Sequence, residues 1–256
     1  MAVRDATQRF SNRVENYVNY RPGYPPELIT TLQAECQLAT ASLVADIGSG
    51  TGILSQLFLK HGNTVYAVEP NQAMRAAGER RLSHYPGFHS IAGRAEATTL
   101  PDQSVDFVVV GQAFHWFDRL AARAEFSRIL KPEGWLMLVW NSRAIEATPF
   151  MQVYEQLLQR FATDYVQVDH TQIKAADLAR FFGQDGMQTK RFTYVQQFDQ
   201  TGIAGRLLSS SYAPEAGHPD YEPMLAELMR IFQRHQQNGL IPFVYDTEMY
   251  YGRLLP

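Results

Sequence analysis

Short apolar runs alternate with longer amphipathic segments between residues 42 and 140 of this chain. Runs of four to six mostly apolar residues predict buried strands, and apolar residues recurring every three or four positions predict helices. The predicted strands are residues 42–47, 64–68, 88–92, 105–110 and 135–140, and the predicted helices are residues 53–60, 71–83 and 118–130. Apolar strands that alternate with helices are typical of a parallel sheet covered on both faces.

The pattern is looser on either side of this region. Helical spacing of Phe10, Val14, Tyr17 and Val18 predicts a first helix, and residues 21–26 (RPGYPP) interrupt it before a second helix at 27–39. Later in the chain, helices are predicted at 149–161, 174–182, 201–210 and 221–235, with a strand at 191–198. Residues 243–250 alternate apolar and polar side chains, which favours an edge strand.

Composition excludes several classes of protein. The chain has 256 residues, 45% of them hydrophobic, and a net charge of −3 without a basic cluster, which disfavours nucleic-acid binding. Its single cysteine, Cys36, excludes internal disulfides and C-x-x-C metal motifs, and scattered histidines give no metal site. No apolar stretch reaches the roughly 18 residues of a membrane span, and no secretory signal is visible. We therefore expect a soluble, cytoplasmic protein without a metal.

The strongest chemical signal is a glycine-rich turn at residues 46–52 (DIGSGTG), between the first strand and its helix. Glycines permit a sharp turn and a close approach by a ligand. Glu69 ends the next strand, where its carboxylate can accept hydrogen bonds from both ribose hydroxyls of a nucleoside. A purely structural turn is one alternative. A nicotinamide site is another, but the G-x-G-x-x-G fingerprint needs glycine where Ile53 stands, and no P-loop lysine follows.

These motifs resemble class I S-adenosylmethionine-dependent methyltransferases. The similarity rests on residues 44–52, residues 68–70 with Asn71 and Met74, residues 93–96 with 100–101, residues 105–117, and residues 130–135. Within the class, residues 20–25 (YRPGYP) and 115–117 (HWF) resemble the type 11, trans-aconitate-methyltransferase-like branch.

The resemblance implies an α/β fold: a doubly wound, mainly parallel, seven-stranded Rossmann-like sheet with helical cap insertions. Its last strand is expected to be antiparallel. We expect one domain over residues 1–256, since no linker divides the chain. Its expected parts are an N-terminal helical flap (1–41), a cofactor-binding core (42–141), cap insertions with a late strand (142–240) and a final strand (241–256).

The resemblance also implies the cofactor, S-adenosyl-L-methionine, and roles for individual residues. The glycine loop would line the methionine moiety, Glu69 would bind the ribose, and Ala95 with Glu96 would meet the adenine. Arg94 stands where many relatives carry an acidic residue. The predicted cofactor-binding residues are Asp46, Gly48, Ser49, Gly50, Gly52, Glu69, Pro70, Asn71, Met74, Ala95, Glu96, Gln112, Tyr20 and Arg21.

The acceptor site is expected beside the ends of the fourth and fifth strands. His115 is the candidate catalytic residue, as a general base or as a substrate-binding group. The predicted substrate-binding residues are His115, Trp116, Asn141, Arg143 and Tyr24, with Arg206 and Tyr212 as further candidates from the cap.

The expected function is methyl transfer to oxygen of a small carboxylic acid or hydroxyl compound. One alternative is carbon methylation of a quinone-like or lipid precursor. Another is a protein that binds the cofactor without transferring methyl. The chain is expected to act as a monomer or homodimer.

Overall fold

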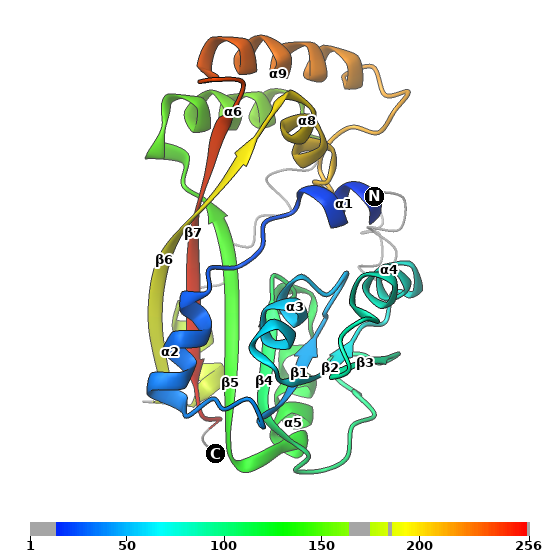
Figure 1. Cartoon of the computed structure of the whole chain (residues 1–256), viewed down its shortest axis with the longest axis vertical. Coiled ribbons are helices and arrows are strands. Elements are labelled where there is room, and N and C mark those ends of the chain that lie inside the picture. The colour runs from blue at the N-terminus through cyan, green and yellow to red at the C-terminus, as the bar shows by residue number, and fades with distance from the viewer. Residues whose placement is uncertain (1–13, 164–174, 184–185, 255–256) are drawn as a thin grey trace.

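Seven strands form one mixed sheet in the order β3-β2-β1-β4-β5-β7-β6 (Figure 1). The computed structural model describes residues 14–163, 175–183 and 186–254. The strands are β1 (Leu43–Ile47), β2 (Thr64–Val68), β3 (Phe88–Ile91), β4 (Val105–Gly111), β5 (Leu130–Arg143), β6 (Met187–Phe198) and β7 (Ile241–Gly252). The first five are parallel neighbours, whereas β7 runs antiparallel to both β5 and β6. The expected mainly parallel sheet with an antiparallel last strand is confirmed.

Helices lie on both faces of this sheet and at its upper end in Figure 1. They are α1 (Val14–Tyr20), α2 (Glu27–Cys36), α3 (Ile53–His61), α4 (Gln72–Leu82), α5 (Arg119–Ile129), α6 (Pro149–Phe161), α7 (Ala175–Phe182), α8 (Gln200–Leu208) and α9 (Tyr221–His235). Short 3-10 turns follow β4 at Phe114–Trp116 and β5 at Ile145–Ala147. The earlier prediction at Phe10 lies outside the described residues.

Alternate residues of the central strands enter two different hydrophobic cores. On β1, Ala45 packs in a core with residues of α5 and α7, whereas Val44 packs in a second core with α2 and α3. Successive side chains of a strand point to opposite faces, so an entirely apolar strand needs cover on both sides. This arrangement explains why the strands of the parallel half are apolar throughout.

The longest strands carry a separate helical cap. β5, β6 and β7 are longer than the other strands of the sheet and extend beyond them. The helices α6, α8 and α9 gather around their upper ends in Figure 1. A third hydrophobic core, which includes Tyr154, Ile203, Leu228 and Phe243, joins these helices to the strand ends. We call α6, α8, α9 and the strand ends that they cover the cap. The short helix α1 contacts both α4 and α8, so it links the cap to the lower half.

The prediction of an edge strand at residues 243–250 is wrong. β7 lies between β5 and β6, and β6 forms the edge. Side chains of β7 do alternate between buried and half-buried positions. Such alternation reports which face of a strand is covered, and it carries no information about how many neighbours the strand has.

Several element ends also differ from the sequence prediction. The second helix stops at Cys36, because Gln37 adopts a left-handed φ of 58° and returns its N–H to the Leu32 carbonyl. The fifth strand extends over residues 130–143, three residues past its predicted end, and so reaches the cap. Within the described part of the chain, no helix is both long and apolar enough to cross a lipid bilayer.

Candidate active site

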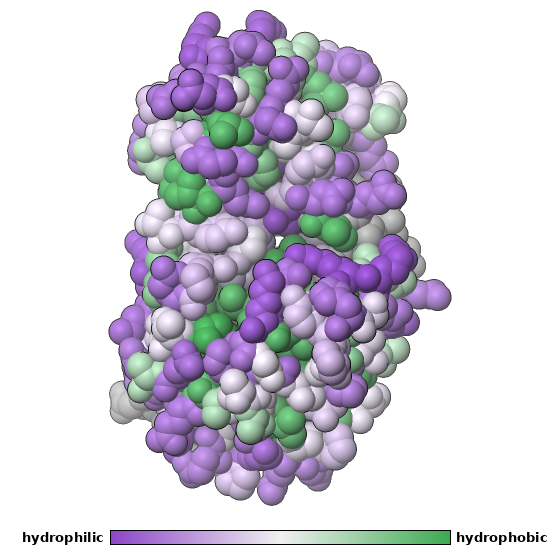
Figure 2. All heavy atoms as spheres, viewed as in Figure 1, coloured by the Kyte–Doolittle hydropathy of each residue, from purple (hydrophilic) through white to green (hydrophobic). Residues whose placement is uncertain are grey.

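A cavity of about 630 Å³ lies between the carboxyl ends of the parallel strands and the cap. Figure 2 shows the molecule hollowed at this level, between its upper and lower halves. Ligands of open α/β sheets bind at the carboxyl ends of the strands, at the point where the strand order reverses. In this sheet that point lies between the neighbouring strands β1 and β4. The lining comes from the ends of β1, β2, β4 and β5, from the segment around α1, and from α6 and α8.

The glycine loop after β1 forms one wall of the cavity. Gly48, Gly50 and Gly52 have φ values of 69°, 57° and 76°, a left-handed conformation that side chains rarely adopt. A Cβ on Gly48 would stand 2.7 Å from the Ala113 Cβ. A Cβ on Gly50 would meet only Met74 Cε, at 3.4 Å, since Gly50 faces the cavity. The loop therefore presents bare backbone to a ligand.

Glu69 lies at the end of β2 with its carboxylate held in place by two backbone amides. Oε2 accepts a hydrogen bond from the Gly50 N–H at 2.9 Å, and Oε1 accepts one from the Asn71 N–H at 2.8 Å. The residue is 8% exposed, and burial raises its pKa although both amides oppose this shift. Asn71 caps α4 by accepting from the amides of Ala73 and Met74. The carboxylate keeps acceptor capacity for hydroxyl groups in the cavity.

Asp46 is buried beneath the glycine loop. Its Oδ2 accepts a hydrogen bond from Ser55 Oγ at 2.6 Å, while its buried Oδ1 has no hydrogen-bond partner in the described part of the chain. Burial raises the pKa of Asp46 to about 7, and the nearby Glu69 carboxylate adds to this effect. A cationic group bound in the cavity would supply the missing partner and favour the ionised form.

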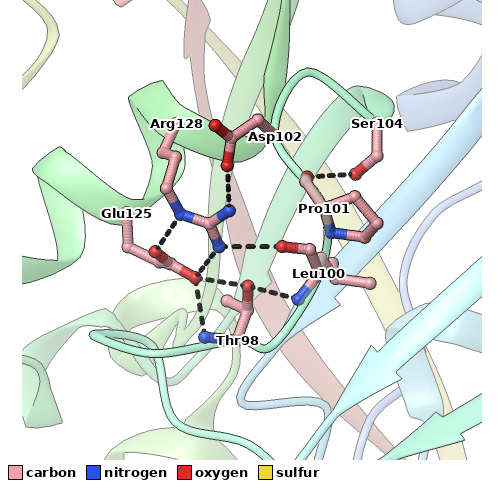
Figure 3. A network of polar contacts seen from close by, with 7 residues as sticks. All are labelled: Thr98, Leu100, Pro101, Asp102, Ser104, Glu125 and Arg128. Carbon is pink, nitrogen blue, oxygen red and sulfur yellow. Dashed lines mark hydrogen bonds and ion pairs between the residues drawn. The ribbon is translucent and has the colours of Figure 1, made fainter.

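A polar network fixes the loop that leads from β3 to β4 (Figure 3). The Thr98 N–H and hydroxyl both donate to Glu125 Oε1 on α5, at 2.7 and 2.5 Å. Arg128 Nη2 donates to the same carboxylate at 2.7 Å and to the Leu100 carbonyl at 2.8 Å. Ala95 and Glu96 of this loop line the cavity. Glu125 and Arg128 are not among the residues predicted from the sequence, and they act by holding this loop in place.

The ends of β4 and β5 form the centre of the site. Gln112 has a φ of 59°, unusual for a residue other than glycine, and its Nε2 donates to the Asn141 carbonyl at 3.1 Å. Such strained conformations cluster at functional sites. Asn141 Nδ2 donates to the Gly23 carbonyl, which ties β5 to the segment that follows α1. His115 and Trp116 lie next to Gln112 on the cavity wall.

The cap end of the cavity is strongly basic. Arg143 forms an ion pair with Glu155 at 3.0 Å and donates to the Tyr212 hydroxyl at 2.9 Å. Arg206 and Arg21 also line this end. Burial acts to raise the pKa of Tyr212, but the three guanidinium groups together lower it below its ordinary value. A negative charge is therefore stabilised here.

Seventeen of the predicted site residues line this one cavity. These are Tyr24, Arg21, Asp46, Gly48, Ser49, Gly50, Glu69, Pro70, Asn71, Met74, Ala95, Glu96, Gln112, His115, Trp116, Asn141 and Arg143. Two predicted residues are not on the wall. Tyr20 packs its ring against Gly205 of α8, and Gly52 caps α3 behind the loop.

Sequence reasoning missed Glu155 of α6 and gave Arg206 of α8 little weight. Glu155 lies on the buried face of α6, between Tyr154 and Leu158, and Arg206 lies on the buried face of α8. One signal in the sequence could have found both residues. Each is charged, yet each stands at a position that helical spacing assigns to the apolar face of its helix. Among the described residues, no cluster of three or more His, Cys, Asp or Glu side chains could hold a metal ion.

Comparison with known proteins agrees with this geometry. The family model described as "Methyltransferase domain" matches residues 45–138. An uncharacterised methyltransferase of Schizosaccharomyces pombe is 28% identical over 251 residues, which are 96% of this chain and 97% of the relative. An uncharacterised methyltransferase of Mycobacterium tuberculosis is 41% identical over 140 residues, 55% of each chain.

A solved structure shares the fold at lower identity. It is that of a candidate type II methyltransferase from Anaeromyxobacter dehalogenans, with a TM-score of 0.68 and 22% identity, over 93% of this chain and 99% of that one. The chain is a methyltransferase, with its methyltransferase domain at residues 45–138.

Proposed function

We propose that this enzyme methylates an oxygen atom of a small carboxylic acid or hydroxyl compound. One observation carries the proposal: the cavity that begins at the glycine loop ends among the polar and cationic side chains of Arg143, Arg206 and Tyr212. A quinone-like or lipid acceptor for carbon methylation would favour a wide, apolar lining at that end. An apolar acceptor would offer no hydrogen bonds to the guanidinium groups at that end. The buried charge of Arg206 would then stay unpaired, which is costly.

The residues around the glycine loop fit S-adenosylmethionine. Gly50 leaves room for a ligand, Glu69 can accept from ribose hydroxyls, and the buried Asp46 Oδ1 lacks a partner that a cationic amino group would provide. When bound, S-adenosylmethionine would supply an electrophilic methyl group on a sulfonium sulfur, for transfer to the acceptor oxygen with the C–S electron pair kept by sulfur.

The chain's own part in the reaction is binding, orientation and exclusion of water. Holding an acceptor in line with the methyl group makes the reaction effectively unimolecular. The cap and the segment around α1 enclose the acceptor end and strengthen polar contacts there. A carboxylate acceptor needs no base, whereas a hydroxyl acceptor must lose a proton. His115, on the cavity wall beside Gln112, is our candidate to take that proton or to hold the acceptor.

Further features of the proposal rest on the sequence. The motifs at residues 20–25 and 115–117 support the trans-aconitate-methyltransferase-like branch. A net charge of −3 argues against a nucleic-acid acceptor, and the single cysteine is compatible with the cytoplasm. We propose that residues 1–256 act as one domain, as a monomer or homodimer.

Two assays test the proposal in sequence. Thermal melts with S-adenosylmethionine, S-adenosylhomocysteine and NAD test the cofactor site. A ligand at one hundred times its Kd adds about 2.7 kcal/mol, or roughly 5–10 °C for a chain of this size. A shift with NAD alone would refute the cofactor assignment. Methyl-labelled cofactor is then offered with carboxylic acids, phenols and carbon nucleophiles. Labelled carbon products without any ester or ether would overturn oxygen transfer, and cofactor binding without any product would favour a binding protein.

A further inference from the structure

Two guanidinium groups at the cap end of the cavity have no acidic partner. Arg206 of α8 is 3% exposed, yet its hydrogen bonds go to neutral acceptors: the Tyr245 hydroxyl at 2.7 Å and Ser210 Oγ at 3.0 Å. Arg21 donates to the Ser209 carbonyl at 3.0 Å. Within the described residues, neither forms an ion pair with Asp or Glu. Arg143 in the same wall does have such a partner, Glu155.

The two unpaired groups lie close together. Both arginines bind Ser209, Arg21 through the carbonyl and Arg206 through the hydroxyl at 3.5 Å. Burial lowers the pKa of Arg21, and repulsion from the Arg206 guanidinium lowers it further. The aromatic rings of Phe243 and Tyr245 lie 5.3 and 5.8 Å from Arg206 and compensate part of its charge. The buried Arg206 and its partly buried neighbour Arg21 remain without a counter-ion.

We propose that Arg206, together with Arg21, binds an anionic group of the acceptor that is separate from the atom receiving the methyl group. The acceptor class is therefore a small molecule with at least one carboxylate or phosphate in addition to the methylated oxygen. A planar guanidinium can hold either anion through two parallel hydrogen bonds. The Tyr212 hydroxyl and Ser211, on the same wall, complete the polar surface. This inference rests on the proposed oxygen methylation.

The cofactor is a second source of a carboxylate, and Arg21 was predicted to contact the cofactor. One carboxylate on Arg21 would still leave Arg206 buried without a counter-ion. Arg206 also belongs to α8 of the cap, whereas Asp46, Gly50 and Glu69 follow the ends of β1 and β2. The proposal therefore depends on Arg206, and the test must separate an acceptor anion from the cofactor carboxylate.

The first measurement uses the unaltered protein saturated with S-adenosylhomocysteine. Thermal melts at constant ionic strength compare succinate, glutarate and adipate with their uncharged dimethyl esters, and inorganic phosphate with chloride. We expect at least one dianion to raise the melting temperature in a saturable manner, while its dimethyl ester has little effect. A response to phosphate but to no dicarboxylate would identify a phosphorylated acceptor. The absence of any response to every anion would overturn the proposal.

The second measurement replaces Arg206. In Arg206→Gln, we expect the anion-dependent shift to disappear and kcat/KM for an anionic acceptor to fall about 100-fold, while the Kd of S-adenosylhomocysteine stays within about twofold. Arg206→Lys keeps the charge and should retain part of the response. Arg230→Gln is the matched control, because Arg230 is exposed on α9 and pairs with Glu227. An equal loss of S-adenosylhomocysteine affinity in Arg206→Gln would mean that the cofactor carboxylate occupies the site.

The two proposals fail in different ways. Equal kcat/KM for an acceptor and for the analogue in which only the additional anionic group is esterified, with methyl transfer intact, would overturn the anion site and leave oxygen methylation standing. Anion-dependent stabilisation that needs Arg206, with methyl transferred only to carbon, would support the anion site and overturn oxygen methylation.

Discussion

We predict that the buried Asp46 carboxyl group loses a proton when the cofactor binds. Its pKa is raised to about 7 because the carboxylate is buried, so about half of the free protein carries a proton there at pH 7. A bound ammonium group next to Oδ1 would favour the ionised form. We therefore expect cofactor binding to release up to about half a proton at pH 7 and only about a tenth at pH 8.

Isothermal titration calorimetry checks this release directly. The apparent binding enthalpy is measured in phosphate, imidazole and Tris buffers at pH 7. Between any two buffers it differs by the difference in their ionisation enthalpies multiplied by the number of protons released. Asp46→Asn keeps an acceptor for Ser55 Oγ and should abolish the release. Asp220→Asn, outside the cavity, is the control. Because His115 and Glu69 line the same cavity, His115→Gln and Glu69→Gln are measured alongside.

The same carboxylate should make the free protein less stable as pH rises. Its folded pKa lies above the ordinary value of 3.8, so the folded state binds more protons than the unfolded state between these two values. Stability therefore falls as pH rises from about 4 to 7, by up to about 4 kcal/mol for a shift of roughly three units. Asp46→Asn should flatten this part of the profile. Binding enthalpies independent of buffer, with a flat wild-type stability profile, would refute the reasoning.

Four further substitutions test the site. Glu69→Ala should weaken cofactor binding by about 1–3 kcal/mol, the range for a charge-assisted hydrogen bond, and unchanged calorimetric affinity would contradict the ribose assignment. Gly50→Val should abolish binding by filling the cavity beside the loop; near-native binding would refute that placement. His115→Ala should lower kcat if the imidazole takes part in the chemical step, whereas a rise in KM alone would make it a binding group. The pKa of Glu125 is lowered to about 2, chiefly by Arg128, so its contribution to stability is lost as pH falls below about 4.5. Glu125→Gln should raise the KM for the cofactor and flatten the acid limb of unfolding; an unaltered acid limb would argue against this network.

Much of the cofactor half could be predicted because its signals are local. The glycine loop, its preceding strand and Glu69 lie within residues 43–69, and left-handed glycines leave a direct mark on the sequence. The cap of α4 by Asn71 follows equally local rules.

The acceptor half could not be predicted to the same depth, because it is assembled from distant segments. Arg21 and Ser209 are 188 residues apart in sequence, and Asn141 reaches Gly23 over 118 residues. The neighbours of β7 depend on long-range pairing that alternation does not specify. The buried charges of α6 and α8 were visible at apolar positions, but only the fold shows that both line the same cavity.

The division of the molecule into separate hydrophobic cores has an evolutionary consequence. The side chains that form the cap core are largely distinct from those that support the glycine loop and Glu69. Substitutions in packing units that share few contacts tend to have additive effects. A lineage can therefore remodel α6, α8 and α9 for a new acceptor while the nucleoside-binding apparatus stays intact. Directed libraries confined to those helices are the natural route to altered substrate preference in this scaffold.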